Sequence, residues 1–179
     1  MKKDAFSRCP GPTRVSLTKT RGPFGVIWMA STEKGLCGIH LGEDVEMLKK
    51  KLSSRKECVF REDPQGNTDA VHQLSQYFQG KRRSFETELD LWGTQFEISV
   101  WRSLIEIPYG KTKSYGEVAA SLGMPKAARA VGGAASRNLV PIVVPCHRLV
   151  RGDGGLGGFS SGIAMKKSLL ELERRFGEA

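Results

Sequence analysis

The chain has 179 residues, a hydrophobic content of 39% and a net charge of +9 from 28 basic and 19 acidic side chains. This composition is sufficient for one or two folded cores, and no apolar run approaches the roughly 20 residues of a membrane-spanning helix. It therefore excludes a disordered chain and helical membrane spans. No apolar signal segment follows Met1, so we expect a cytoplasmic protein, or a nuclear one in a eukaryote, with no membrane partner.

The first half predicts a small α+β domain, which we place at residues 1–85. Residues 1–12 contain Pro10-Gly11-Pro12 and predict a loosely held arm. Alternating apolar residues and turns between residues 13 and 41 predict three antiparallel strands. Two helices follow, the first capped by Asp44 and the second running from about Asp69 to Gly80. Their apolar faces are Val45, Leu48 and Leu52 in the first helix, and Val71, Leu74 and Phe78 in the second. Nothing in this half indicates catalysis.

The second half, residues 86–179, predicts a mostly helical domain. We place the connection between the domains at residues 81–93, after the glycine that ends the second helix. Thr94 and Glu97 have the spacing of a capping box, which predicts that a helix begins there. Phe96, Val100 and Leu104 follow at helical spacing and predict its buried face.

A helix-turn-helix is predicted between residues 114 and 135. Ser114 and Glu117 form a second capping box, and the short helix that they open ends at Gly123. A second helix begins near Lys126, and two helices joined by such a turn are typical of DNA readers. Its consecutive glycines, 132 and 133, weaken a helix by about 1 kcal/mol each relative to alanine. Close approach to an external surface explains them, and a tightly packed internal helix pair is the alternative.

A candidate nucleophile lies in the stretch Val143-Val144-Pro145-Cys146-His147-Arg148-Leu149-Val150. Its apolar run and two prolines predict a buried extended segment that ends in a bend. The adjacent His147 and Arg148 favour the reactive thiolate of Cys146. Neighbouring side chains of an extended segment face opposite sides, so we expect a water molecule to join Cys146 and His147. The alternative is an inert core cysteine.

Positive charge is concentrated around this cysteine. Residues 98–152 contain eight basic and two acidic side chains, a net charge of +6. Such a surface favours a polyanionic partner, with an affinity that falls as salt rises. General solubility is the alternative explanation of the charge.

Two further segments supply candidate ligand-binding groups. Residues 151–162 contain six glycines and carry Phe159 and Ser160, which could close over a flat ligand. The last helix, about residues 163–176, buries Leu169, Leu172 and Phe176. Glu173 lies near that apolar stripe, where it either pairs with an arginine or orients a histidine.

The cysteines favour free thiols. They are widely spaced and form no CxxC pair, so we expect neither disulfides nor a bound metal or cofactor. A zinc site remains an alternative, built from Cys9, Cys37, His40 and either Cys58 or His72, although its spacing fits no standard pattern.

Several short segments between residues 90 and 175 follow one another in a specific order. They are Gly93-Thr94-Gln95-Phe96 with Val100-Trp101, Ile107-Pro108-Tyr109-Gly110, Ser114-Tyr115, residues 125–132, Asn138, Pro141-Ile142, Pro145-Cys146-His147-Arg148 and residues 157–162. Together they resemble the O6-alkylguanine-DNA alkyltransferases, also called methylated-DNA-protein-cysteine methyltransferases. The N-terminal half matches only in general shape. The resemblance implies DNA repair by a single irreversible alkyl transfer from O6-alkylguanine in duplex DNA, after nucleotide flipping, and leaves O4-alkylthymine open as a second substrate.

The resemblance also implies a role for each matching position. Cys146 is the acceptor, His147 is a base acting through water, Glu173 holds the histidine and Tyr115 donates to the leaving purine. Ser160 holds the O6 edge, Phe159 stacks on the base and Asn138 braces the turn before the cysteine. Arg129 enters the duplex in place of the flipped nucleotide, and the other expected DNA contacts are Ser114, Lys126, Ala127, Ala128 and Arg137. The chain departs from the family pattern at two positions. Phe159 stands where many relatives have a tyrosine, and Gly158 stands where some relatives have an asparagine.

Other functions compete with this interpretation. A non-catalytic protein that flags alkylated DNA shares the shape but lacks the acceptor cysteine. A cysteine hydrolase leaves the helix-turn-helix unexplained, and a sequence-specific transcription factor needs more base-edge donors than an alanine-rich helix offers. We therefore expect a monomeric, cofactor-free alkyltransferase.

Overall fold

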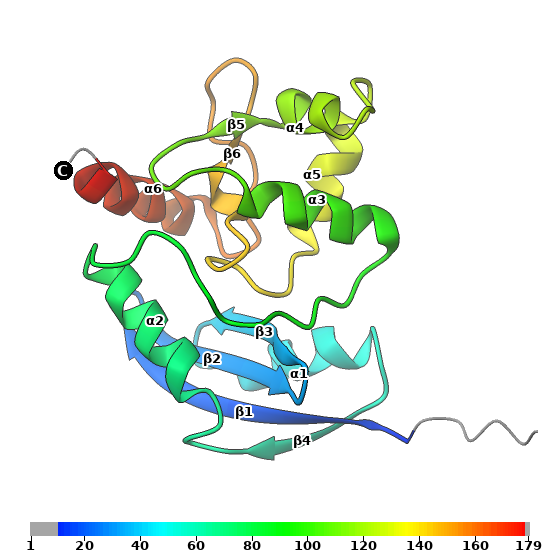
Figure 1. Cartoon of the computed structure of the whole chain (residues 1–179), viewed down its shortest axis with the longest axis vertical. Coiled ribbons are helices and arrows are strands. Elements are labelled where there is room, and N and C mark those ends of the chain that lie inside the picture. The colour runs from blue at the N-terminus through cyan, green and yellow to red at the C-terminus, as the bar shows by residue number, and fades with distance from the viewer. Residues whose placement is uncertain (1–10, 178–179) are drawn as a thin grey trace, which may run out of the picture.

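The computed structural model describes residues 11–177, with a four-stranded sheet in one half of the molecule and a group of helices in the other (Figure 1). The strands are β1 (Thr13–Gly22), β2 (Gly25–Thr32), β3 (Gly35–Leu41) and β4 (Cys58–Glu62). Their order is β3-β2-β1-β4, in which β4 is parallel to β1 and the other neighbours are antiparallel. The three predicted strands are confirmed. The prediction missed β4 because this edge strand has no fully buried residue and so no strong apolar alternation. Most of the predicted N-terminal arm lies outside the described residues.

Two helices, α1 (Val45–Ser53) and α2 (Thr68–Phe78), flank the sheet (Figure 1). The Asp44 side chain caps α1 by accepting the backbone N–H of Glu46 at 2.9 Å, as predicted. The predicted face of α2 was wrong in part, since Val71 and Phe78 are only half-buried. Its buried residues are Ala70, Gln73, Leu74 and Tyr77. Tyr77 is buried because α2 also packs against the C-terminal half.

The open edge of β3 is covered by segments from later in the chain. Leu36 donates its N–H to Glu88 at 2.8 Å, so the segment after α2 pairs with the strand. Further along the same edge, the N–H of Ile39 donates to the carbonyl of Leu139 at 2.7 Å. An uncovered edge strand invites pairing with other chains, so these contacts complete the sheet.

Up to residue 177, the C-terminal half contains four α-helices, one 3₁₀ turn (Cys146–Arg148) and one short strand pair. The helices are α3 (Gln95–Ile105), α4 (Tyr115–Ser121), α5 (Ala128–Ser136) and α6 (Ile163–Gly177), and the pair is β5 (Lys113–Ser114) with β6 (Leu149–Val150). Both predicted capping boxes are present, at the start of α3 and of α4. Helices α4 and α5 form the predicted helix-turn-helix, although α5 begins at Ala128 rather than near Lys126. Among residues 11–177, no helix combines the length and apolarity of a membrane span.

Candidate active site

Cys146 lies at a cavity of about 370 Å³ between the helix-turn-helix and the glycine-rich loop. Its side chain is almost completely buried, with the residue 4% exposed. Helix α5 lines the cavity through Gly132, Ala135 and Ser136, and the loop lines it through Gly158, Phe159 and Ser160. Tyr115, the first residue of α4, completes the wall. Four residues that the sequence singled out, Cys146, Tyr115, Phe159 and Ser160, therefore meet at one cavity.

The backbone before Cys146 is held by Asn138. The Asn138 Oδ1 accepts the N–H of Val140 at 2.9 Å, and its Nδ2 donates to the carbonyl of Val144 at 2.9 Å. The same Nδ2 lies 3.1 Å from the Cys146 Sγ and donates to it. Ile142 has a φ of 76°, a left-handed conformation that a β-branched residue rarely adopts. Asn138 thus fixes a strained turn and the nucleophile together.

The predicted extended conformation at the cysteine was wrong. Residues Cys146–Arg148 form one 3₁₀ turn, closed by a hydrogen bond of 2.9 Å from the N–H of Arg148 to the carbonyl of Pro145. Proline has no N–H to contribute to a strand ladder but can begin a turn, and this favours the observed geometry. The argument that neighbouring side chains face opposite sides of an extended chain therefore does not apply here.

His147 is completely buried beside the cysteine and hydrogen-bonds to α6. Its Nε2 lies 2.8 Å from the Glu173 Oε1. Burial lowers the pKa of His147, although the contact with Glu173 opposes this effect. The neutral ring donates Nε2–H to the carboxylate and keeps a lone pair on Nδ1. That Nδ1 has no hydrogen-bond partner among residues 11–177 and can act as a base.

Glu173 is the centre of a buried polar cluster. Arg148 contacts both carboxylate oxygens, with Nη2 at 2.9 Å from Oε1 and Nε at 3.0 Å from Oε2. The backbone N–H of Gly110 also donates to Oε2, at 2.9 Å. Burial raises the pKa of Glu173, but the hydrogen bonds from His147 and Arg148 outweigh it and hold the pKa at about 2. The sequence left open whether this carboxylate pairs with an arginine or orients a histidine, and the structure shows both.

The expectation that Arg148 favours the Cys146 thiolate was wrong. The Arg148 guanidinium faces Glu173 and the carbonyl of Ile107, so its charge is matched within the cluster. Burial raises the pKa of Cys146, while the hydrogen bond from Asn138 and the charge of Lys166 oppose this effect in part. In the described state Cys146 is therefore a thiol that needs a base.

Sequence reasoning missed Lys166, which is completely buried in α6. Its ammonium donates to the carbonyls of Leu149 and Leu156 and lies 3.4 Å from the carbonyl of Gly158. It therefore joins β6 to the glycine-rich loop that lines the cysteine cavity. Lys166 and Glu173 are seven residues apart, about two helical turns, so the periodicity of α6 could have placed both on the buried face.

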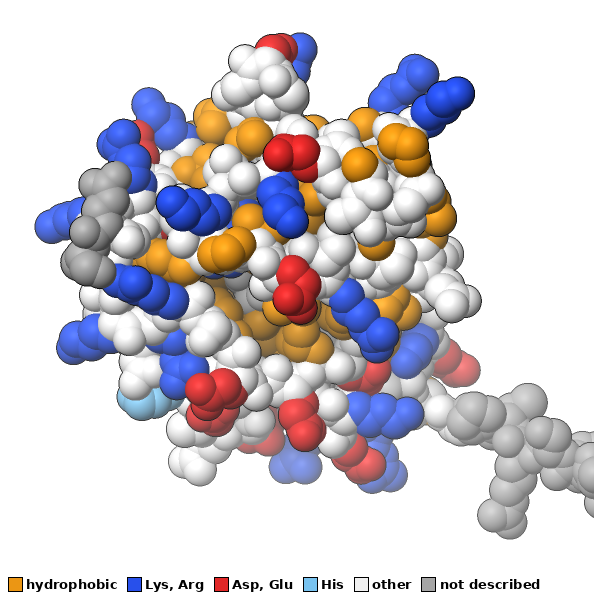
Figure 2. Space-filling model, turned by 45° about the horizontal axis from the view of Figure 1, so that its top comes forward, with side chains coloured by type: hydrophobic (Ala, Val, Ile, Leu, Met, Phe, Trp, Pro, Cys, Tyr) orange, Lys and Arg blue, Asp and Glu red, His pale blue; other side chains and the backbone are white. Residues whose placement is uncertain are grey.

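A second cavity, of about 740 Å³, opens along the helix-turn-helix and is lined by Tyr115, Ala128, Arg129, Gly132 and the loop. Arg129 is exposed there, and within the described chain it makes no hydrogen bond or ion pair. Lys126 is also exposed, whereas Ala127 is the N-cap residue of α5 and Ser114 caps α4. Figure 2 shows this side of the molecule, where apolar side chains lie among Lys and Arg side chains.

The two glycines of α5 have no internal packing requirement. A Cβ added at Gly132 would lie 3.6 Å from the Tyr115 ring, and one at Gly133 would lie 3.4 Å from the Arg137 guanidinium. These are ordinary van der Waals distances, so a close-packed internal helix pair does not explain the glycines. Gly132 lines the second cavity, and this position fits the other explanation, the close approach of an external surface.

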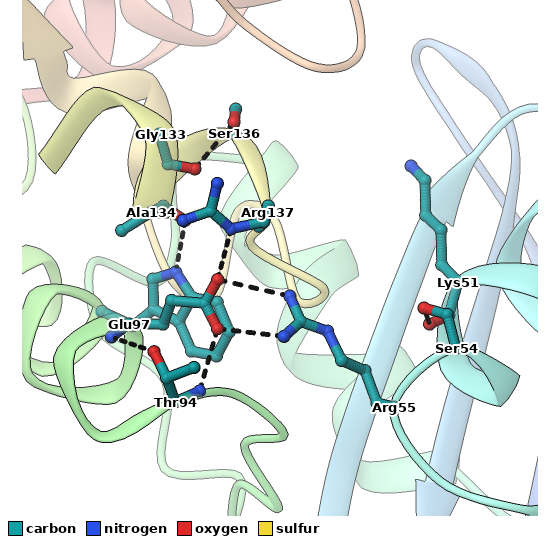
Figure 3. A network of polar contacts seen from close by, with 10 residues as sticks. Lys51, Ser54, Arg55, Thr94, Glu97, Gly133, Ala134, Ser136 and Arg137 are labelled. Atoms are coloured by element: carbon teal, nitrogen blue, oxygen red, sulfur yellow. Dashed lines mark hydrogen bonds and ion pairs between the residues drawn. The ribbon is translucent and has the colours of Figure 1, made fainter. Parts of the chain in front are cut away.

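Arg137, an expected DNA contact, takes part in an ion-pair network that joins the two halves (Figure 3). Glu97 accepts hydrogen bonds from Arg137 Nε and, at 3.0 Å, from Arg55 Nη1. Burial raises the pKa of Glu97, but these hydrogen bonds and one from the Thr94 backbone hold it at about 2. Arg55 follows α1, so the network ties the end of α5 to the N-terminal half.

The alternative zinc site gains no support from the residues that the structure describes. Cys37 is buried and its thiol donates to the carbonyl of Ala30 at 3.3 Å, and burial raises its pKa to about 12. In residues 11–177 no group of three or more His, Cys, Asp and Glu side chains is arranged to hold a metal ion. Cys9 lies outside these residues.

The fold and the site define an α+β helix-turn-helix protein with a buried cysteine, histidine and glutamate site. Two family models match the chain: the ribonuclease-like domain of 6-O-methylguanine DNA methyltransferase at residues 16–91 and its DNA-binding domain at residues 95–175. The chain belongs to the 6-O-methylguanine DNA methyltransferase family, as the sequence motifs predicted. The likeness extends through the N-terminal half, for which the motifs indicated only a general similarity of shape.

Individual relatives agree with this assignment. The methylated-DNA–protein-cysteine methyltransferase of Methanosarcina barkeri is 43% identical over 151 residues, which cover 84% of this chain and 92% of the relative. The solved structure of Mycobacterium tuberculosis OGT in complex with DNA has a TM-score of 0.79 and 39% identity, covering 91% of this chain and 94% of that one. The O6-methylguanine-DNA methyltransferase of the archaeon Pyrococcus kodakaraensis has a TM-score of 0.68 and 33% identity, covering 89% and 98%. These structures confirm the predicted α+β fold.

Proposed function

We propose that this protein repairs DNA by transferring the alkyl group of O6-alkylguanine irreversibly to the Sγ of Cys146. The observation that carries the proposal is the position of Cys146 at a cavity below the helix-turn-helix, next to a neutral buried histidine. The activity is that of a methylated-DNA–protein-cysteine methyltransferase, in agreement with the names of the relatives. A relative solved in complex with DNA supports DNA as the partner.

The reaction uses the groups around the cavity in sequence. His147 Nδ1 takes the thiol proton, either directly or through a water molecule, and the Glu173 carboxylate stabilises the resulting imidazolium. The thiolate attacks the alkyl carbon, so that an S–C bond forms while the C–O6 bond breaks and its electron pair goes to the guanine. The Tyr115 hydroxyl donates to the purine as it gains charge. Burial raises the pKa of Tyr115, which keeps it a donor. The proton lost by the thiol is balanced by the proton that the guanine gains.

The thioether product cannot be reversed by any of these groups, so one molecule repairs one lesion.

O6 of a stacked guanine is out of reach of a buried sulfur, and the nucleotide must leave the duplex at a cost of a few kcal/mol. Arg129 offsets part of this cost by filling the gap, and the small side chains of α5 enter a narrow groove. Phe159 and Ser160 then hold the base, and contacts to phosphate dominate a salt-sensitive affinity. The protein acts as a monomer without a cofactor.

The decisive experiment uses duplex DNA that carries radiolabelled O6-methylguanine. The full-length protein should acquire one label per molecule, and peptide mapping should place it on Cys146. Cys146→Ala should bind this duplex with unchanged affinity and acquire no label, whereas Cys58→Ala should be labelled like the wild type. Label on another residue, or transfer that persists in Cys146→Ala, would refute the proposal. Binding without any transfer in the wild type would favour a lesion-flagging protein.

A further inference from the structure

Tyr77 is a buried phenol from the N-terminal half that reaches the active-site carboxylate. It lies in α2, is completely buried, and donates its hydroxyl to the Glu173 Oε1 at 2.8 Å. The two residues are 96 positions apart in the chain. The same oxygen accepts the Nε2–H of His147, also at 2.8 Å. Tyr77 and the candidate base therefore share one acceptor atom.

The environment of Tyr77 fixes its hydroxyl as a donor. Its ring packs against those of Phe85 at 5.5 Å and Tyr109 at 5.8 Å between centroids. Burial, followed by the charge of Glu173, raises the pKa of Tyr77 well above its ordinary value of 10.0. The phenol is therefore protonated at neutral pH, and it serves the carboxylate as a hydrogen-bond donor.

The two oxygens of Glu173 differ in their donors and share one of them. Oε2 accepts the Gly110 N–H, and Oε1 accepts Tyr77, His147 and the Nη2 of Arg148. The Nε of Arg148 lies between the two oxygens, at 3.0 Å from Oε2 and 3.2 Å from Oε1. The contacts to Oε2 set the plane of the carboxylate, and the Tyr77 hydroxyl takes part of the negative charge of Oε1. Loss of that hydroxyl leaves more of this charge directed at His147 and removes one restraint on the ring.

We propose that Tyr77 is a positioning residue for alkyl transfer, through which the N-terminal half of the chain holds Glu173 in the orientation that keeps His147 a neutral base. The inference rests on the proposed function, in which His147 takes the thiol proton. The charged groups that act on His147 are Glu173 and Lys166 of α6 and the neighbouring Arg148. Of the groups that contact Glu173, Tyr77 alone comes from the N-terminal half within the described residues.

Tyr77→Phe tests the proposal because it removes the hydroxyl and keeps the ring. The single-turnover rate of transfer from labelled duplex is measured between pH 5 and 9. A more basic His147 is protonated at higher pH, so the acid limb of the rate profile should move upward in pH. At neutral pH the rate should fall by about threefold to tenfold, the effect of losing one hydrogen bond of typical net strength. Wild-type kinetics with an unmoved profile would overturn the proposal.

The matched control is Tyr109→Phe, in the same aromatic cluster. The Tyr109 hydroxyl has no hydrogen-bond partner in the described part of the chain, so its loss should leave the rate and the profile unchanged. An equal effect of both variants would show that packing, rather than the bond to Glu173, is responsible, and would overturn the proposal. Thermal unfolding of both variants checks that they are folded.

A second reagent separates this inference from the proposed function. Iodoacetamide alkylates Cys146 without DNA, and the rate at each pH is followed by mass spectrometry of the cysteine peptide. If the wild type transfers no label from DNA, the proposed function fails. The iodoacetamide profile of Tyr77→Phe still tests the positioning role, because a displaced acid limb supports it and coincident profiles reject it.

Discussion

Glu97, in the first turn of α3, accepts a hydrogen bond from the Nε of Arg137, the residue that follows α5 (Figure 3). Arg55 binds the other side of the same carboxylate at 3.0 Å. One nearly buried carboxylate thus compensates two guanidinium groups that come from opposite halves of the chain. The arrangement makes the position of α5, the second helix of the helix-turn-helix, depend on the N-terminal half.

Glu97→Gln should lower the free energy of unfolding by about 2 kcal/mol. Glutamine can keep the hydrogen bonds of the capping box. It removes the negative charge that pairs the guanidinium groups of Arg55 and Arg137, and this loss destabilises the folded state. Arg137 is half-exposed, so water reduces the loss of stability. The control is Glu117→Gln, the corresponding position of the exposed second capping box, which should change stability little. Urea unfolding of both variants is the measurement, and equal effects would contradict the assignment.

Lys166→Met should loosen residues 151–162 and slow alkyl transfer by about tenfold. Methionine fills a similar space but leaves the carbonyls of Leu149 and Leu156 without their donor, at about 1–3 kcal/mol for each unsatisfied group. Hydrogen exchange of the loop amides and single-turnover rates report the two effects. Lys167→Met, at the exposed neighbouring position, should match the wild type, and unaltered exchange in Lys166→Met would contradict the predicted role.

Arg129→Ala should slow repair of duplex DNA by about tenfold, equivalent to about 1.4 kcal/mol, and change the reaction with free O6-benzylguanine by less than about twofold. The free base needs no extrusion, so the insertion role of Arg129 is absent from that reaction. Lys126→Ala provides the contrast, because loss of a phosphate contact weakens binding to all duplexes and lowers the salt slope by about one. Equal losses with both substrates in Arg129→Ala would remove the insertion role.

Acid should destabilise the protein through Glu173. Its pKa in the folded state is about 2, against an ordinary value of 4.5, so the folded state favours the charged form. The contribution is complete above about pH 4.5, and it is lost as the pH falls from there through about 2. A shift of this size corresponds to about 3 kcal/mol. Unfolding measured from pH 7 to 3 should show the loss, and Glu173→Gln should flatten it. A wild-type free energy of unfolding that does not change over this range would refute the prediction.

Local signals allowed much of this molecule to be predicted from its sequence. Both capping boxes and the helix-turn-helix depend on residues a few positions apart, and the structure contains them. The stretch around Cys146 identified the site for the same reason, since its chemistry is carried by adjacent residues. The conformation of that stretch was wrong because an apolar run does not distinguish a strand from a buried turn.

The remaining features depend on contacts between distant residues. Lysine is rarely buried, so Lys166 was not a candidate for the core. The bond between Tyr77 and Glu173 joins segments whose proximity only the fold creates. The φ of 76° at Ile142 could not be inferred either, because the residue type argues against it and Asn138 imposes it from outside the turn.

The covering of β3 has a consequence for the order in which the chain folds. The sheet is built from residues 13–62, but the partners of its outer strand, Glu88 and Leu139, are synthesised later. A ribosome-bound chain that has not reached Glu88 and Leu139 therefore leaves the N–H groups of Leu36 and Ile39 at this edge unpaired, and a second nascent chain can attach there. Recombinant yield should accordingly be more sensitive to translation speed between residues 62 and 139 than after it.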